Sequence, residues 1–366
     1  MKKYFRFSFL LVIGYVFLTC NRNIEFNNSF SLGKGVNVSH WLSQSDKRGE
    51  ERLNYITQAD FDTIAALGFD FVRIPVDEEQ LWDSSGKKEA EAFRLLHSSI
   101  QWAIHAELGV IVDLHILRSH NFIAESNPLW TDPAEQEKLA NLWRQLSAEL
   151  NQYPNNRVAY EILNEAVADD PEDWNKLLNK VFAAIRVLEP ERKIVIGSNR
   201  WQLPETFPAL RLPENDRNII LSFHTYLPIL ITHYRAPWVD FAEYDGPVNY
   251  PGRPIAPEHL DGLSEKAMSV MGWANNYFTK DSLEKSIEPA IKVAKEMNLP
   301  LFCGEFGVYP KYISKDIRLR WYKDMCDIFN RNSIAYCHWC YKGDFPIVDA
   351  DRRTDWSLVS ILIGNN

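Results

Sequence analysis

Residues 158–166 read VAYEILNEA, an apolar run that ends in the polar pair Asn164-Glu165. A short, nearly continuous apolar run is typical of a strand buried in a parallel sheet. A second run of the same form, PLFCGEFG at residues 300–307, carries Glu305 near its end. Ligands of α/β folds bind at the carboxyl ends of the strands. We therefore expect both glutamates to lie in one site.

The rest of the chain alternates between similar apolar runs and amphipathic stretches. Strands are expected at residues 33–40, 69–76, 110–116, 158–166, 193–198, 218–226, 300–307 and 334–341. Helices are expected at residues 57–67, 89–108, 133–150, 170–188, 281–297, 314–331 and 355–363. This alternation predicts an α/β fold, a single (β/α)₈ TIM barrel. A doubly wound open sheet is the alternative, but it usually has a Gly-rich loop after its first strand, and residues 40–43 read HWLS.

A long segment follows the sixth predicted strand. Residues 227–280 are rich in Pro, Gly and aromatic residues and lack a clear period. Loops of this length in a compact domain are usually functional. We expect an insertion that forms a wall or lid of a cleft.

The first residues are typical of a targeting segment. Lys2, Lys3 and Arg6 precede the apolar residues 7–18, and Cys20 follows Leu18-Thr19. This pattern resembles a bacterial lipoprotein signal, with residues 1–19 removed and Cys20 lipidated. An ordinary secretory signal is the alternative. We expect residues 24–366 to form the catalytic domain, secreted across the inner membrane and lipid-anchored at the cell envelope, in the periplasm or on the outer surface.

Composition narrows the classes of partner. The formal net charge is −9, and no basic run occurs outside the amino terminus, which argues against nucleic acid. Twelve Trp among 13% aromatic residues are consistent with stacking on sugars, although many will be core residues. Cys337 and Cys340 form a C-x-x-C, but no second pair accompanies it, and we expect buried thiols rather than a metal site. A monomer is expected.

Polar and aromatic residues gather at the predicted strand ends. They are His40, Arg73, His115, Asn164, Glu165, Trp201, His224, Tyr226, Glu305 and Trp339. Each alone has a structural interpretation, such as a core histidine or a salt bridge. Together they include two carboxylates but no lysine for a Schiff base, no metal-binding spacing and no G-x-S-x-G. Paired carboxylates favour glycoside hydrolysis without a cofactor.

Six ordered motifs make the chain resemble glycoside hydrolase family 5, the cellulase family of retaining (β/α)₈ glycosidases. They are Val72-Arg73-Ile74-Pro75, Asp113-Leu114-His115, Leu163-Asn164-Glu165, His224-Thr225-Tyr226, Gly304-Glu305-Phe306-Gly307 and His338-Trp339. The sequence departs from the commonest family pattern at Ala166, after His115, and at residues 35–42. These departures bear on the subfamily and thus on the substrate.

The resemblance implies roles for the site residues. Glu165 would be the acid/base and Glu305 the nucleophile, with carboxyl groups about 5–5.5 Å apart. The substrate-binding residues would be Arg73, His115, Asn164, His224, Tyr226 and Trp339, and we add His40 and Trp201 as candidates. The expected activity is endo-β-1,4-glucanase on a β-glycan. Alternatives are a mannanase, a xylanase or an exo-acting β-glycosidase, and, outside enzymes, a carbohydrate-binding lipoprotein on a barrel scaffold.

Overall fold

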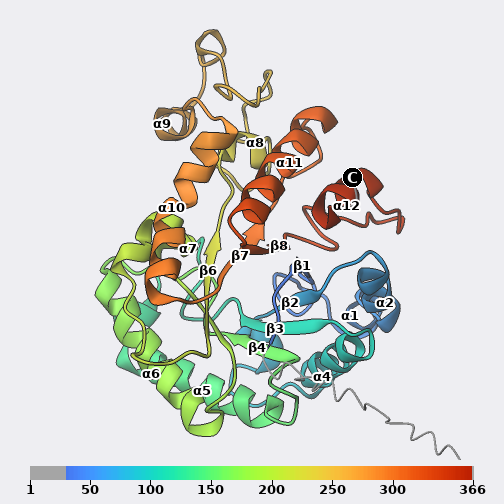
Figure 1. Cartoon of the computed structure of the whole chain (residues 1–366), viewed down its shortest axis with the longest axis vertical. Helices are drawn as coiled ribbons and strands as arrows, with labels where there is room; N and C mark the ends of the chain where they lie inside the picture. Colours follow the sequence, from blue (N-terminus) through green and yellow to red (C-terminus); the bar gives the residue numbers. More distant parts are fainter. Residues whose placement is uncertain (1–29, 365–366) are drawn as a thin grey trace, which may run out of the picture.

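A closed eight-stranded parallel barrel forms the centre of the protein (Figure 1). The computed structural model describes residues 30–364. The strands are β1 (Lys34–Asn37), β2 (Phe71–Val76), β3 (Gly109–Leu114), β4 (Val158–Glu161), β5 (Ile194–Gly197), β6 (Ile219–His224), β7 (Leu301–Phe306) and β8 (Ala335–His338). Each strand pairs with the next, and β8 pairs with β1, where Gly35 lies opposite Cys337. The predicted (β/α)₈ barrel is confirmed.

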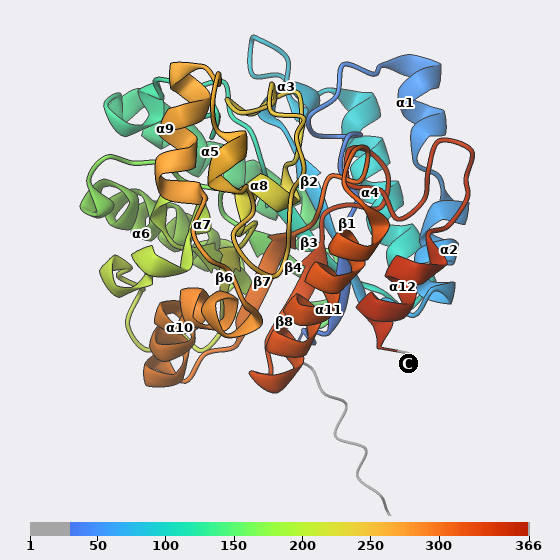
Figure 2. The same ribbon diagram turned by 90° about the horizontal axis from the view of Figure 1, so that it is seen from above.

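Helices surround the barrel, as Figures 1 and 2 show. The seven expected helices are α2 (Gln58–Ala66), α4 (Ala90–His105), α5 (Pro133–Leu150), α6 (Pro171–Leu188), α10 (Lys280–Met297), α11 (Lys315–Arg331) and α12 (Trp356–Ile363). The sequence reading missed α1 (Gly49–Tyr55), α3 (Glu78–Leu81), α7 (Asn199–Gln202), α8 (Ile229–Thr232) and α9 (Glu265–Ala274). Four of the five have seven residues or fewer, too short to establish a helical period, and α9 lies in the segment 227–280, whose sequence lacks a clear period.

The barrel interior has an apolar layer below a polar one. Side chains alternate along a strand, so every second residue points inward. The lower layer is a buried cluster of Phe71, Ile111, Ala159, Val195, Ile220, Phe302 and Cys337, packed against Phe30. Two residues further along the strands, Arg73, Asp113, Glu161 and Ser222 are fully buried. The sequence thus places charged and polar groups inside the barrel, at the carboxyl ends of the strands.

A bulge on β7 sets the position of Glu305. Phe223 lies opposite Cys303, but the next residue, His224, lies opposite Glu305, so Gly304 is an extra residue on β7. A Cβ atom at position 304 would lie 2.8 Å from both His224 Nε2 and Ser222 Oγ. Only glycine therefore fits here, and the bulge re-aims the following side chain.

β4 is shorter than predicted. It ends at Glu161, so Asn164 and Glu165 lie in a turn beyond the strand. The φ angle of Glu165 is 45°, a left-handed conformation that no regular strand contains. The expectation that the strand runs to Ala166 was therefore wrong in its boundary, although Asn164 N–H still donates to Leu114 O (3.1 Å) at the rim.

Residues 225–279 connect β6 to α10 and contain α8, α9 and the short 3₁₀ helix Pro257–His259. In Figure 1 the loops beside α9 project away from the barrel. The interpretation of this segment as an insertion stays a prediction. No helix within residues 30–364 has the length and apolar character needed to cross a bilayer. The expected signal segment and Cys20 lie outside the described residues.

Candidate active site

Arg73 is the central cation of the polar layer. Its guanidinium contacts three carboxylates, namely Asp113 Oδ2 (Nη2, 3.0 Å), Glu161 Oε2 (Nε, 2.6 Å) and Glu305 Oε1 (Nη1, 2.8 Å). It also donates to Asn164 Oδ1 (2.8 Å). A buried charge is tolerated only when it is paired and hydrogen-bonded. Arg73 therefore joins β2, β3, β4 and β7 into one ionic network.

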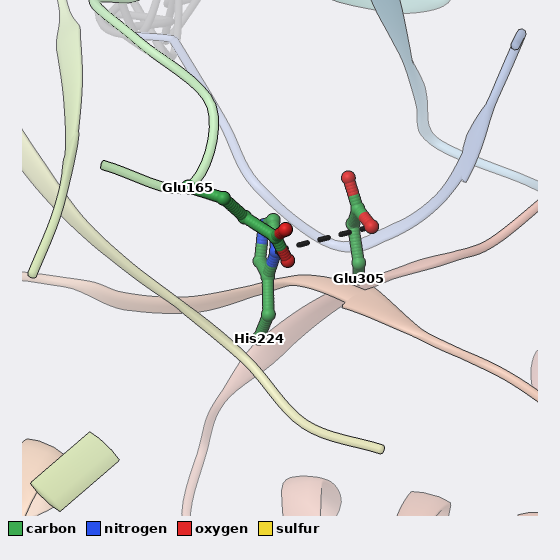
Figure 3. A group of neighbouring side chains, drawn as sticks. All are labelled: Glu165, His224 and Glu305. Atoms are coloured by element: carbon green, nitrogen blue, oxygen red, sulfur yellow. Dashed lines mark hydrogen bonds and ion pairs between the residues drawn. The ribbon is translucent and has the colours of Figure 1, made fainter. Parts of the chain in front are cut away.

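The Glu165 and Glu305 side chains face each other, and His224 lies beside Glu165 (Figure 3). One nitrogen of His224 and one oxygen of each glutamate all lie within 4.8 Å of one another. His224 Nδ1 lies 2.8 Å from Glu165 Oε1 and 3.8 Å from Glu305 Oε2. Both glutamates are buried, with exposed fractions of 7% and 5%. The two predicted carboxylates therefore do meet in one site.

The surroundings of the two carboxyl groups differ in charge. Glu305 pairs with the Arg73 guanidinium and accepts a hydrogen bond from the Tyr226 hydroxyl (3.0 Å). Burial raises the pKa of Glu305, but the Arg73 guanidinium and the Tyr226 hydrogen bond oppose that rise. Burial raises the pKa of Glu165 well above its ordinary value, and the neighbouring Glu305 charge raises it further. A proton shared by this pair therefore favours Glu165.

Two histidines beside the carboxylates, His224 and His115, are held neutral. Burial lowers the pKa of His224 well below its ordinary value, and the charge of Arg73 lowers it further. Burial also lowers the pKa of His115 to about 3. His115 Nδ1 lies 2.6 Å from Asp113 Oδ2, whose pKa burial raises to about 7. Neutral imidazoles leave the negative charge of the carboxylates to be balanced by Arg73.

Three predicted binding residues keep a polar atom free. Within the described residues, His115 Nε2, Asn164 Nδ2 and His224 Nε2 are buried and have no hydrogen-bond partner. Trp339 follows β8 directly, and its ring stacks on His115, with an interplanar angle of 9° and centroids 5.6 Å apart. A flat aromatic face beside unpaired donors and acceptors is suited to a polyhydroxylated ring.

The other two predicted residues lie at the edges of the site. Trp201 is 41% exposed and donates from Nε1 to Phe122 O (2.8 Å). Within residues 30–364, no hydrogen bond joins Trp201 to Glu165 or Glu305. His40 follows β1, and its ring lies 6.1 Å from Trp339 and pairs with Asp344 (3.1 Å). Burial alone would lower the pKa of His40, but hydrogen bonds to Asp344 and Cys340 raise it to about 10.

Sequence reasoning missed three buried residues of the site. Glu161 pairs with Arg73, Asn37 accepts from it (3.0 Å), and Gln202 contacts Glu161 (3.3 Å). The period of two within β4 could have identified Glu161, because it lies two residues after the inward Ala159. The same period could have identified Asn37, the last residue of β1. It could not have identified Gln202, because Gln202 lies in an irregular turn.

The cysteines within residues 30–364 are buried thiols. Cys303, Cys326, Cys337 and Cys340 are free and buried, as expected for structural thiols.

Among residues 30–364, Glu165, His224 and Glu305 form the one group spaced to hold a metal ion. The His224–Glu165 hydrogen bond and the Arg73–Glu305 ion pair account for that spacing by themselves.

Comparisons with known proteins agree with this arrangement. The family model described as cellulase (glycosyl hydrolase family 5) matches residues 32–344. Endoglucanase C of Acetivibrio thermocellus is 31% identical over 341 residues, which covers 91% of this chain and 98% of the relative. Cellodextrinase A of Ruminococcus flavefaciens is 28% identical over 306 residues, with 82% and 83% covered. A solved endoglucanase structure, 25% identical, superposes with a TM-score of 0.72 over 91% of this chain and 97% of its own. The chain therefore belongs to glycosyl hydrolase family 5 and is a glycosidase.

Proposed function

We propose that this protein is a retaining endo-β-1,4-glucanase. The observation that carries the proposal is the close approach of Glu165 and Glu305, whose nearest oxygens lie within 4.8 Å. Retaining glycosidases hold their two carboxyl groups about 5–5.5 Å apart, whereas inverting enzymes leave about 6.5–9.5 Å for a water molecule. The endoglucanase relatives support β-1,4-glucan as the substrate.

The first step uses the charge difference between the two carboxyl groups. Glu305, ionised beside Arg73 and Tyr226, attacks the anomeric carbon. Glu165 gives its proton to the glycosidic oxygen as the bond to the leaving sugar breaks. The products are the free leaving chain and a glycosyl ester on Glu305.

The second step reverses the role of Glu165. Ester formation removes the negative charge of Glu305, which is one cause of the raised pKa of Glu165. The pKa of Glu165 therefore falls, and its carboxylate takes a proton from water as the water attacks the ester. Asn164 Nδ2 and His115 Nε2 bind hydroxyls of the reacting sugar, and Trp339 supports its ring.

Product stereochemistry and substrate range test the activity. The purified protein should rapidly lower the viscosity of carboxymethyl cellulose, and proton NMR should detect the β-anomer first. Preferred cleavage of mannan or xylan, or release of single end sugars, would instead favour the alternatives. Binding of glucan without any turnover, or an α-anomer as first product, contradicts the proposal.

Azide separates the two glutamates. With Glu305→Ala, azide should restore turnover of an aryl β-cellobioside and give the α-glycosyl azide, because azide attacks in place of the nucleophile. With Glu165→Ala, azide should give the β-glycosyl azide from the glycosyl-enzyme. Glu296→Ala, at an exposed glutamate, is the control and should keep wild-type activity. The same azide anomer from both variants refutes the assignment.

We further propose that Cys20 carries a lipid that anchors the enzyme at the cell envelope. The supporting observation is the basic and apolar sequence of residues 2–18 directly before Cys20. In a bacterial host, labelled palmitate should appear in the full chain but not in Cys20→Ala. Equal labelling of both chains excludes this anchor.

A further inference from the structure

The turn that contains Glu165 is hydrogen-bonded to a second turn, which follows β5. Asn199 bonds Ala168 twice, donating from Nδ2 to its carbonyl and accepting its N–H at Oδ1, both at 2.9 Å. Trp201 N–H donates to Ala166 O (3.2 Å). Gln202 Oε1 accepts the N–H of Glu165 itself (2.9 Å). Residues 165–168 and 199–202 thus form a hydrogen-bonded pair of turns at the rim of the barrel.

Both turns hold unfavourable backbone conformations. Glu165 has φ 45°, and Arg200, Trp201 and Gln202 have φ 52°, 60° and 54°. A residue other than glycine in this region costs about 1–3 kcal/mol and persists only where its surroundings hold it. The hydrogen bonds between the two turns hold the main chain of Glu165 in this conformation.

The Gln202 side chain is itself fixed inside the barrel. It is fully buried, and its amide donates to Ser222 Oγ (3.0 Å) and to Glu161 Oε1 (3.3 Å). A Cβ atom at position 197 would lie 2.3 Å from Gln202 Cγ, so this side chain packs directly on Gly197, the last residue of β5. Gln202 therefore connects the main chain of Glu165 to the ionic network around Arg73.

We propose that Gln202 is a positioning residue that fixes the left-handed turn at Glu165 and so aims the Glu165 carboxyl at the glycosidic oxygen. The inference rests on the proposed function, in which Glu165 is the acid. Proton transfer requires the donor within hydrogen-bond reach of the leaving oxygen. His224 bonds the carboxyl end of Glu165, and Gln202 bonds its N–H, so the two together define where the proton is held.

Leaving-group dependence distinguishes this role from a structural one. A good leaving group such as 2,4-dinitrophenolate departs without a proton, whereas a poor one such as phenolate needs the acid. In Gln202→Met, kcat/KM for phenyl β-cellobioside should fall about 10- to 100-fold, because small misplacements of a reacting group cost this much. The value for the dinitrophenyl substrate should stay within about threefold, because the nucleophile is untouched.

Controls make each outcome decisive. Gln80→Met removes another fully buried amide, which bonds Arg52 (3.1 Å) and no residue of the site. This variant should change kcat/KM for both substrates by the same factor. Gln202→Glu keeps an oxygen acceptor for the Glu165 N–H and should recover activity towards the phenyl substrate at low pH, where the added carboxyl is protonated. If Gln202→Met does not fold, Ser222→Ala removes a partner of the Gln202 amide and should give a smaller effect of the same kind.

Glu165→Ala, measured alongside, separates this inference from the proposed function. It should show a strong leaving-group dependence of kcat/KM. If it does and the Gln202 and Ser222 variants do not, or if they slow both substrates equally, the positioning role is wrong. If Glu165→Ala itself shows no leaving-group dependence, the assignment of the acid fails instead.

Discussion

The two sides of the candidate active site hold their carboxyl groups by different means. Glu305 lies on β7 and bonds a guanidinium and a hydroxyl through its side chain. Glu165 lies in a strained turn beyond β4, where its carboxyl group bonds a neutral imidazole and its N–H bonds Gln202. The first arrangement favours a negative charge, and the second favours a protonated carboxyl group. The difference supports the proposed roles of Glu305 as nucleophile and Glu165 as acid.

Removal of the Arg73 guanidinium should have the largest effect on the difference between the two carboxyl groups. Arg73→Met leaves Asp113, Glu161 and Glu305 buried without their counter-charge. We expect kcat to fall at least about 10³-fold and the free energy of unfolding to drop by about 3–5 kcal/mol, as when one partner of a buried pair is removed. Denaturant unfolding and initial rates measure the two effects.

The stability defect of Arg73→Met should depend on pH. Burial already raises the pKa of Asp113 to about 7 and that of Glu161 above its ordinary value, and loss of the cation raises both further. The folded state then binds more protons than the unfolded state, so stability falls as pH rises. The defect should be larger at pH 8 than at pH 5. Arg144→Met, at an exposed pair with Glu137, should cost about 0–1 kcal/mol. An equal cost from both variants contradicts the central role of Arg73.

A milder change tests the hydroxyl on the Glu305 side. Tyr226→Phe removes the hydrogen bond to Glu305 Oε2, and a bond to a charged group is worth about 1.5–3 kcal/mol. The pKa of Glu305 should rise, because its ionised form loses a donor. The acidic limb of the pH profile of kcat/KM should therefore move to higher pH, while the alkaline limb stays in place. Tyr234→Phe, whose hydroxyl bonds Gly246 O, is the control and should move neither limb. A moved alkaline limb would place Tyr226 on the Glu165 side instead.

The smallest expected effect is a change in the pKa of Glu165, measured in a variant without turnover. Glu305→Gln removes the charge that contributes to the raised pKa of Glu165, so that pKa should fall. Carbon-13 NMR of labelled glutamate carboxyls follows it directly in the inactive variant. Asp344→Asn, at a half-exposed acid paired with His40, should leave the Glu165 midpoint unchanged. An unchanged midpoint in Glu305→Gln means that burial alone sets the pKa of Glu165.

The barrel and most of the residues at its carboxyl end can be predicted from local sequence patterns. Short apolar runs alternating with amphipathic stretches predict eight strand–helix units, and residues at strand ends meet because parallel strands end on one face. Arg73, His115, His224, Glu305 and Trp339 were found in this way. The period of two also predicts which residues point inward, because side-chain direction along a strand is a local property.

The positions of the Glu165 and Glu305 side chains depend on the tertiary structure and could not be predicted from the sequence. The bulge at Gly304 and the left-handed turn at Glu165 depend on contacts between segments far apart in the chain. Gln202 lies 37 residues from Glu165 and reaches its N–H only because β4 and β5 are neighbours. Such conformations are locally unfavourable, so no local pattern predicts them. The protonation states of the site residues also depend on the tertiary structure, because each pKa is set by burial and by neighbours that only folding brings together.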